Sequence, residues 1–437
     1  MSRERNDVLS WPVAATTYVL AYGVLMSADA IEPAAPEAPP RESHPLDIPR
    51  DGVPPVVVTP EGLARAAAVL AAGAGPVAVD AERASGHRYG QRAFLVQLRR
   101  EGAGTVLLDP AALPDLSTVG AALDGAEWVL HAASQDLPCL ADVGMRPRAL
   151  FDTELGSRLA GLQRVGLAAV VEELLGLSLA KEHSAVDWSV RPLPEPWLRY
   201  AALDVEVLVE LRDVLSLELE RQGKLGWALE EFAALAAAEP SAPRADPWRR
   251  TSGMHKVRTR RQLAIVRELW FARDLLARQQ DVSPGRIIPD ASLVEAALAQ
   301  PTTRRALVGL TSFTGRGSRR HADIWFEAVR RALDLPEEEL PPQHLPTEGP
   351  PPPRVWPDRD PAAAARLAHA REAVGLVAAE HALPVENLLS PDAVRRLCWS
   401  PPEPVDEAAV RAFLLERGAR EWQVDLTAPA LTAALTG

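Results

Sequence analysis

Short apolar runs with brief polar connections fill the chain between Val56 and His131, and this pattern predicts strands. The runs are "PVAVDAE", "AFLVQLRR", "TVLLDP" and "EWVLHAA". The first three follow one another too closely to leave room for helices, so antiparallel hairpins are expected, with parallel strands after them. Ahead of them, the apolar residues near Val56 predict a short strand, and Thr59 is a suitable N-cap for the helix that follows.

Helical spacing of apolar residues takes over further along the chain. The stretch from Asp136 to Gly176 is expected to be mostly helical, and Glu195 to Gln222 is expected to form one long helix. The fold class predicted for residues 55–236 is therefore α/β, with a mixed sheet.

Proline-rich segments divide the rest of the chain. Residues 237–247 and 336–361 predict linkers, and each precedes a helical module, at 248–335 and 362–437. The segments "FARDLLARQQDVSPGRIIPDASL" and "HAREAVGLVAAEHALPVENLLSPDAV" share one order: alanine–arginine on a helix, a proline, two aliphatic residues and a Pro-Asp helix start. The modules are therefore expected to be copies of one unit, although alanine-rich helices also resemble one another by chance.

Residues 1–54 are expected to be disordered or to be a misannotated N-terminal extension. Val8 to Met26 is apolar and about as long as a membrane span, yet it contains a proline and a glycine. Three interpretations stay open: a start codon placed upstream of a true start at Met26, a membrane anchor, or a folded extension. The first is preferred, so no stable membrane association is expected.

The charge distribution points to nucleic acid more clearly than the total charge does. The 437 residues carry a formal net charge of −12, but residues 244–331 hold 18 Lys/Arg against 8 Asp/Glu. A basic segment on an acidic protein is typical of a phosphate-binding module, although arginines on solvated helix faces would give the same count. The two cysteines lie far apart, which excludes a disulfide framework or a zinc-finger spacing and agrees with a cytoplasmic location.

Four acidic residues and a tyrosine carry the candidate chemistry. Asp80 and Glu82 alternate on a predicted strand and share a face; Asp136 follows a strand; Tyr200 and Asp204 lie one helical turn apart. Each alone has a plain explanation, such as a loop-facing acid, a helix cap or a half-buried tyrosine. Together, four carboxylates suit Mg²⁺ or Mn²⁺, and two such ions can clamp the attacking and leaving oxygens of a phosphodiester.

The segments "AVDAE", "HAASQDL" and "DWSVRPLPEPWLRYAALDVEVL" resemble the three exonuclease motifs of the DEDD superfamily, tyrosine subtype, and ribonuclease D in particular. The resemblance runs from about Val56 to Leu219, and Ala81 stands where the family often has Thr. The helical modules resemble HRDC domains, and the second is divergent. This resemblance implies a ribonuclease H-like exonuclease domain followed by two small all-α modules, and hydrolysis from a 3′ end.

By motif position, the resemblance also implies residue roles. Asp80, Glu82 and Asp204 would ligate the first of two divalent metal ions, and Asp80 would also reach the second. Asp136 would hold the second ion through water, and Tyr200 would orient the attacking water. Nucleic-acid contacts are expected from Gln97, Arg191, Arg249, Arg250, Lys256, Arg258, Arg260 and Arg261. Stacking on bases is considered for Trp248, His255 or Phe313.

The preferred function is a metal-dependent 3′–5′ exoribonuclease that removes nucleoside 5′-monophosphates from tRNA precursors or other structured RNA. One alternative is a DNA 3′–5′ exonuclease; another is a non-catalytic nucleic-acid-binding protein with a relic site; a membrane-tethered enzyme is a third. A chain ending near Pro240 is expected to keep activity on short single strands and to lose affinity for long RNA. The oligomeric state stays open.

Overall fold

The computed structural model describes residues 43–179, 185–239, 244–313, 315–345 and 349–436. The apolar segment from Val8 to Met26 lies outside the described residues. Within those residues, none of the helices combines the length and the apolar character needed to cross a membrane.

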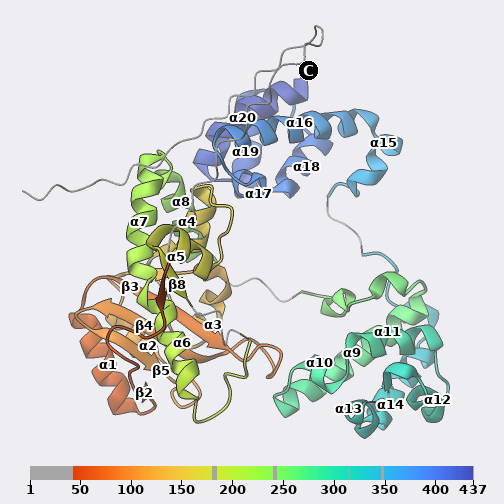
Figure 1. Ribbon diagram of the computed structural model, residues 1–437. Coiled ribbons are helices and arrows are strands. Elements are labelled where there is room, and N and C mark those ends of the chain that lie inside the picture. Colours follow the sequence, from red (N-terminus) through yellow and green to blue (C-terminus); the bar gives the residue numbers. More distant parts are fainter. Residues whose placement is uncertain (1–42, 180–184, 240–243, 314, 346–348, 437) are drawn as a thin grey trace, which may run out of the picture. The chain divides into compact units, whose positions relative to one another are not determined.

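A six-stranded mixed sheet forms the centre of the N-terminal domain (Figure 1). Its strand order is β2-β5-β4-β3-β6-β7. The β3–β4 and β4–β5 pairs are antiparallel, and β2–β5, β3–β6 and β6–β7 are parallel, so the predicted hairpins are confirmed. The strands are β2 (Val56–Val57), β3 (Ala74–Arg83), β4 (Ala93–Glu101), β5 (Gly104–Leu108), β6 (Glu127–Leu130) and β7 (Ala149–Asp152).

Helices cover both faces of this sheet. On one face, odd-numbered residues of β3 such as Val77 and Val79 pack with α1 (Pro60–Ala72), α2 (Ser117–Ala122) and α3 (Leu137–Asp142). Thr59 caps α1 as expected, because its side chain accepts from the Gly62 amide at 3.1 Å. Ala78, on the other side of β3, belongs to the second core, which includes α4 (Thr153–Leu159), α5 (Leu167–Leu175), α7 (Leu208–Arg221) and α8 (Leu225–Ala236).

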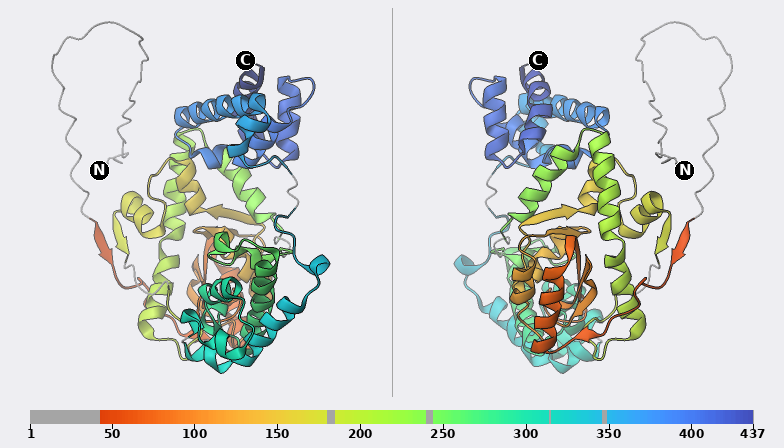
Figure 2. Two further views of the ribbon diagram at one scale, coloured as in Figure 1. Left: turned by 90° about the vertical axis from the view of Figure 1, so that its right-hand side faces the viewer. Right: turned by 90° about the vertical axis from the view of Figure 1, so that its left-hand side faces the viewer.

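Three local expectations for this domain each missed a strand or a helix break. The segment expected to lack order includes β1 (His44–Leu46), which pairs in parallel with β8 (Leu177–Leu179) as a separate two-stranded sheet (Figure 2). The stretch expected to be mostly helical contains β7, a four-residue edge strand with too few residues to show a period. The expected long helix is broken at Val207 into α6 (Glu195–Glu206) and α7, although neither proline nor glycine marks the break.

The two helical modules repeat the same succession of helices. α9 (Arg260–Gln280), α10 (Pro284–Ile287) and α11 (Asp290–Ala299) correspond in order and length to α16 (Pro361–Glu380), α17 (Val385–Leu388) and α18 (Pro391–Trp399). In each module the long first helix packs against the third helix of this series and against the module's last helix, α14 (Ala322–Asp334) or α20 (Glu421–Thr436). This agreement supports the predicted internal copy. The remaining helices are α12 (Arg304–Val308), α13 (Arg316–Arg320), α15 (Trp356–Arg359) and α19 (Glu407–Glu416).

The second module shares an apolar core with the N-terminal domain. The Trp227 ring of α8 stacks on the Trp422 ring of α20, with centroids 5.1 Å apart, and Trp422 Nε1 donates to Glu231 at 3.2 Å. Trp356 is fully buried in the same core, so the second module begins inside the segment expected to be a linker. The first module has a core of its own, built around Trp248 and Trp325, against which the half-buried Tyr89 packs.

Candidate active site

Three of the predicted acids converge on one point. Asp80 and Glu82 come from β3, Asp204 comes from α6, and one carboxylate oxygen of each lies within 4.8 Å of the others. The alternation of β3 directs Asp80 and Glu82 to the face on which α6 packs, because successive strand residues point to opposite sides. Such a group of oxygens fits a hard divalent cation.

Burial makes this group of carboxylates costly without a cation. Desolvation, followed by the charges of the neighbouring acids, holds the pKa of Glu82 well above its usual value. Desolvation first and Asp80 second raise the pKa of Asp204 in the same way. The pKa of Asp80 is also raised by burial. A divalent cation would favour the charged forms of all three, so the donor set suits a metal ion.

Asp136 lies beside this group but outside it. It follows β6, whose carboxyl end meets the carboxyl end of β3 because the two strands are parallel. Asp136 shares a hydrogen bond with Asp80, and burial, then the Asp80 charge, raises the pKa of Asp136 to about 8. Its side chain makes no capping bond to α3, although it occupies the cap position. The plain explanation of Asp136 as a helix cap is therefore wrong.

Asp152 positions the segment that carries Asp136, and it was missed in the sequence. Its carboxylate accepts from the amides of Ala132 at 3.0 Å and Ala133 at 2.9 Å, and it also caps α4. Ala132 has a φ of 60°, an uncommon conformation for a residue with a Cβ. The Asp-Thr pair at the start of α4 was a helix-cap signal, but nothing local in the sequence ties it to Ala132.

Tyr200 lies one turn before Asp204 on α6, and their side chains are hydrogen-bonded. Burial, then the Asp204 charge, raises the pKa of Tyr200 far above its usual value. The phenol is therefore neutral and can orient water rather than act as a base. The Trp188 ring packs beside Tyr200, with centroids 6.4 Å apart.

Gln97 and Arg191 bind protein groups near the site, and the nucleic-acid contacts expected of them stay a prediction. Gln97 is fully buried, and its amide donates to Asp80 Oδ2 at 2.6 Å. Arg191 makes a bidentate pair with Asp109, at 2.7 Å for both bonds, and also donates to the carbonyls of three other residues. These bonds fix the segment that carries Trp188.

The basic residues expected to bind nucleic acid divide into two groups. Arg249 pairs with Asp246, whereas Arg260 and Arg261 donate to main-chain carbonyls between Ala332 and Pro341. These three arginines hold the first module together. The exposed members of the set are Arg250, Lys256 and Arg258. Trp248 and Phe313 are fully buried in the core, which removes them as stacking platforms, whereas His255 is exposed.

Two further side chains lie near the acids. Arg83, the last residue of β3, pairs with Asp136 at 3.3 Å. His131 is hydrogen-bonded to Thr153 Oγ1 at 2.9 Å, and burial lowers its pKa to about 4. His131 is therefore a neutral, packed residue, whereas Arg83 brings a positive charge to Asp136.

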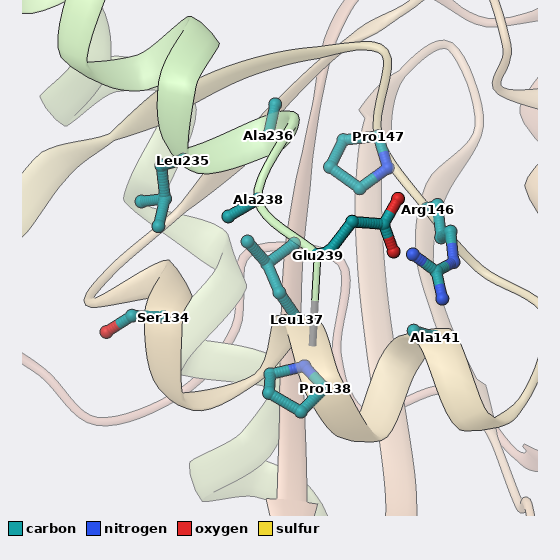
Figure 3. Close-up of a pocket in the computed structure, with 10 residues that line it drawn as sticks. All are labelled: Ser134, Leu137, Pro138, Ala141, Arg146, Pro147, Leu235, Ala236, Ala238 and Glu239. Atoms are coloured by element: carbon teal, nitrogen blue, oxygen red, sulfur yellow. The ribbon is translucent and has the colours of Figure 1, made fainter. Parts of the chain in front are cut away.

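A pocket of about 230 Å³ lies between α3 and the end of α8 (Figure 3). Its wall is mostly apolar, and the carboxylate of Glu239 points toward the Arg146 guanidinium in the view of Figure 3. None of the five motif residues lines it, so it is distinct from the acid cluster. The lining residues are Ser134, Leu137, Pro138, Ala141, Arg146, Pro147, Leu235, Ala236, Ala238 and Glu239.

Comparison with known proteins identifies the family. Residues 55–220 match the family model for 3′–5′ exonucleases, residues 262–329 match the HRDC domain, and residues 349–435 match the 3′ to 5′ exonuclease C-terminal domain. Ribonuclease D of Gluconacetobacter diazotrophicus is 34% identical over 284 residues, which cover 63% of this chain and 71% of the relative. The chain belongs to the ribonuclease D family. Ribonuclease D of Escherichia coli is 33% identical over 271 residues, 61% of this chain and 71% of that protein.

Solved structures agree with this assignment. Ribonuclease D of Escherichia coli, described as an exoribonuclease involved in structured RNA processing, has a TM-score of 0.64 and 28% identity, over 87% of this chain and 98% of that chain. A Bifidobacterium adolescentis protein reaches a TM-score of 0.82 and 41% identity, over 91% and 100% of the two chains. The chain is thus a 3′–5′ exonuclease of the ribonuclease D type with a mixed α/β catalytic core and a helical C-terminal region. The first helical module matches the HRDC model, and the second matches the C-terminal domain model.

Proposed function

We propose that this ribonuclease D family member hydrolyses RNA from the 3′ end with two divalent metal ions, Mg²⁺ or Mn²⁺, and releases nucleoside 5′-monophosphates. One observation carries the proposal: Asp80, Glu82 and Asp204 converge within 4.8 Å, and Asp136 is hydrogen-bonded to Asp80 beside them. This arrangement offers two neighbouring positions for cations that share Asp80.

The first ion would be held by Asp80, Glu82 and Asp204, and the second by Asp80 and Asp136. When bound, the ions supply Lewis-acid activation of water and stabilise the charge on the leaving 3′ oxygen. The carboxylates supply the compensating negative charge, and Gln97 fixes the orientation of Asp80 through its 2.6 Å bond.

Tyr200 orients the attacking water. The phenol keeps its proton, so its oxygen can either donate to the water or accept from it, and the bond to Asp204 limits its rotation. The packing of Trp188 on Tyr200 restricts the ring in the same way. No side chain needs to be modified covalently, because the water attacks the phosphorus directly.

The substrate class proposed is structured RNA, such as tRNA precursors, bound upstream of the cut end by the first helical module. That module carries the chain's basic segment, and its exposed cations include Arg250, Lys256 and Arg258, with Arg316, Arg319 and Arg320 on α13. Phosphate contacts of this kind weaken as salt rises. Charge reversal at Lys256 and Arg258 should therefore reduce RNA affinity and flatten its dependence on salt.

The reaction can be tested with one RNA labelled at the 5′ end or at the 3′ end, and with a DNA of the same sequence, in Mg²⁺ or Mn²⁺. The proposal predicts that the 3′-labelled RNA releases labelled mononucleotides and that the 5′-labelled RNA gives a ladder of fragments shortened from the 3′ end. It predicts no reaction in EDTA. Asp204→Asn should lose nearly all activity, whereas Asp213→Asn, an exposed acid on α7, should not. Faster cleavage of DNA than of RNA would reassign the substrate to DNA 3′ ends. Absence of any cleavage would leave a binding protein with a relic site.

A further inference from the structure

Arg83 lies at the edge of the acid cluster, at the end of the strand that carries Asp80 and Glu82. The β3–β4 pairing is irregular between Glu82 and Arg83, and the contacts of the guanidinium show where its side chain reaches. Its guanidinium donates to the Gln135 carbonyl through Nη1 and pairs with Asp136 through Nη2 at 3.3 Å. The side chain is 22% exposed, so it is anchored on one side and reachable from solvent.

Asp136 is consequently held between a carboxylate and a cation. Asp80 shares a hydrogen bond with it, and the Arg83 guanidinium pairs with it at 3.3 Å. The three acids of the first ion position, in contrast, face one another. The two positions proposed for metal ions thus differ in the metal-free protein: the first holds three converging carboxylates, and the second has a ligand already paired with a guanidinium.

We propose that Arg83 is a positioning residue that acts as the counter-ion of Asp136, and that the second metal ion must displace it in order to bind. This inference rests on the two-ion reaction proposed above. The pairing keeps Asp136 aligned beside Asp80 while the position is empty. It also makes the second ion weaker than the first, because a divalent cation at Asp136 must break this ion pair and then meets a positive charge close by.

The physical basis is the competition of two cations for one carboxylate. Two positive charges a few ångströms apart repel each other appreciably at the effective dielectric of a partly exposed site. Only part of this repulsion lowers the affinity for the second ion, because the Arg83 side chain can move toward solvent, with or without its hydrogen bond to the Gln135 carbonyl. The net effect expected on removing the charge is about tenfold tighter binding of the second ion.

The test is a Mn²⁺ titration of the full chain, followed by the loss of the free-ion electron paramagnetic resonance signal, without substrate. Wild type should bind two ions with separate affinities, and Asp136→Asn should lose the weaker one. Arg83→Gln should tighten the weaker ion by about tenfold and the stronger one much less, because the guanidinium pairs with Asp136, whereas only its charge reaches Glu82. Retention of the stronger ion also verifies that the variant is folded. Arg83→Lys keeps the charge, so its weaker ion should stay close to wild type.

Arg148→Gln is the matched control, because this arginine pairs with Asp124 on the surface and should leave both ions unchanged. An unchanged or weakened second ion in Arg83→Gln would overturn the inference and reduce Arg83 to a structural contact. Equal tightening in Arg83→Gln and Arg83→Lys would also overturn it, since charge would not be the cause. A wild type that binds a single ion would instead refute the two-ion reaction itself.

Discussion

Tyr200 combines burial with a neighbouring acid, and the two together decide its chemical role. Both effects raise the pKa of the phenol, which favours its neutral form in the metal-free protein. The proposed role of the hydroxyl is therefore the orientation of water beside Asp204. Gln97 and Asp109 act one layer further back: Gln97 fixes Asp80, and Asp109 fixes Arg191 and with it Trp188.

Tyr200→Phe tests the role of the hydroxyl. The ring should keep its packing on Trp188, so the fold and the affinity for Mn²⁺ should change little. Loss of a group that orients the nucleophile should lower kcat about 100-fold while KM stays near wild type. Single-turnover kinetics on a short RNA measure this, with Arg199→Ala as control, because Arg199 pairs with Glu195 on the surface of the same helix. A kcat within twofold of wild type would remove Tyr200 from the reaction.

The raised pKa values of the acids predict opposite effects of pH on the metal-free and the metal-bound protein. Asp136 titrates at about 8 in the fold, against a usual value of 3.8, so it binds a proton that the unfolded chain releases. Its contribution to stability is fully present below about pH 4 and is lost as the pH rises through about 8. Metal binding requires the deprotonated forms and strengthens over the same interval.

In EDTA, the Tm should therefore fall from about pH 6 to about pH 8.5, and the gain in Tm on adding Mg²⁺ should grow. Differential scanning fluorimetry at both pH values measures the two trends. Asp136→Asn removes the titrating group with little change of shape, so its Tm in EDTA should depend less on pH. Identical pH dependence in the two proteins would show that Asp136 is not the group responsible.

All five motif residues could be read from the sequence because their chemistry is local: an alternating pair on a strand, an acid after a strand, and a pair one helical turn apart. The residues that position these five side chains could not be predicted in this way. Asp152 meets Ala132 from twenty positions away, Asp109 meets Arg191 across 82 positions, and Arg83 pairs with Asp136 only because β3 and β6 are parallel neighbours. Such partnerships depend on topology, which no local pattern contains.

At the scale of elements, β6 and β7 together build the turn that presents Asp136. β7 ends at Asp152, and the Asp152 carboxylate receives two amides of the turn that leaves β6. The turn is therefore stabilised from the neighbouring strand rather than from within. This explains how Ala132 is maintained in the left-handed region directly before the segment that carries Asp136.

Asp152→Asn should weaken the turn and the reaction together. The amide that replaces one oxygen cannot accept, so at least one buried N–H loses its partner, at a cost of about 1–3 kcal/mol. The Tm should fall. The kcat, measured at a temperature well below the Tm, should also fall because Asp136 is less well placed. Asp124→Asn on the surface is the control. A lower Tm with an unchanged kcat would limit Asp152 to its role as the cap of α4.

The strands and helices could be predicted where enough residues repeat the apolar spacing of a strand or a helix. The strands of the central hairpins and the capped first helix follow from alternation and from Thr59. β7 was concealed because four residues carry no clear period, and it forms only because β6 offers a free edge. The break between α6 and α7 has no helix-breaking residue; it lies next to Glu206, whose buried carboxylate pairs with Arg50 and Arg99.

At the scale of the whole molecule, the catalytic domain and the last module form one apolar core. The stacked Trp227 and Trp422 rings lie in it, and α8 contributes to it from the catalytic side. A chain that ends near Pro240 would expose this face of α8, so the expectation that such a truncation keeps its activity does not fit the structure. The first helical module, with its own core, is the part suited to removal.

Trp422→Ala tests this shared core. Truncating a buried tryptophan costs about 3–5 kcal/mol, and the loss should appear in the unfolding transition that Mn²⁺ stabilises. Trp325→Ala is the matched variant in the first module, where an equally buried tryptophan should affect a transition insensitive to Mn²⁺. Calorimetry with and without the ion separates the two. If Trp422→Ala affected only an unfolding transition that Mn²⁺ does not stabilise, the last module would unfold independently of the catalytic domain.

The proposed reaction requires two cations side by side among Asp80, Glu82, Asp136 and Asp204. The most direct measurement is the anomalous scattering of Mn²⁺ in crystals of the full chain with an uncleavable RNA 3′ end. The account predicts two peaks, one contacting Asp80, Glu82 and Asp204 and the other contacting Asp80 on the side of Asp136, with Arg83 withdrawn from Asp136. A single peak among the first three acids, with Arg83 still paired to Asp136, would contradict it.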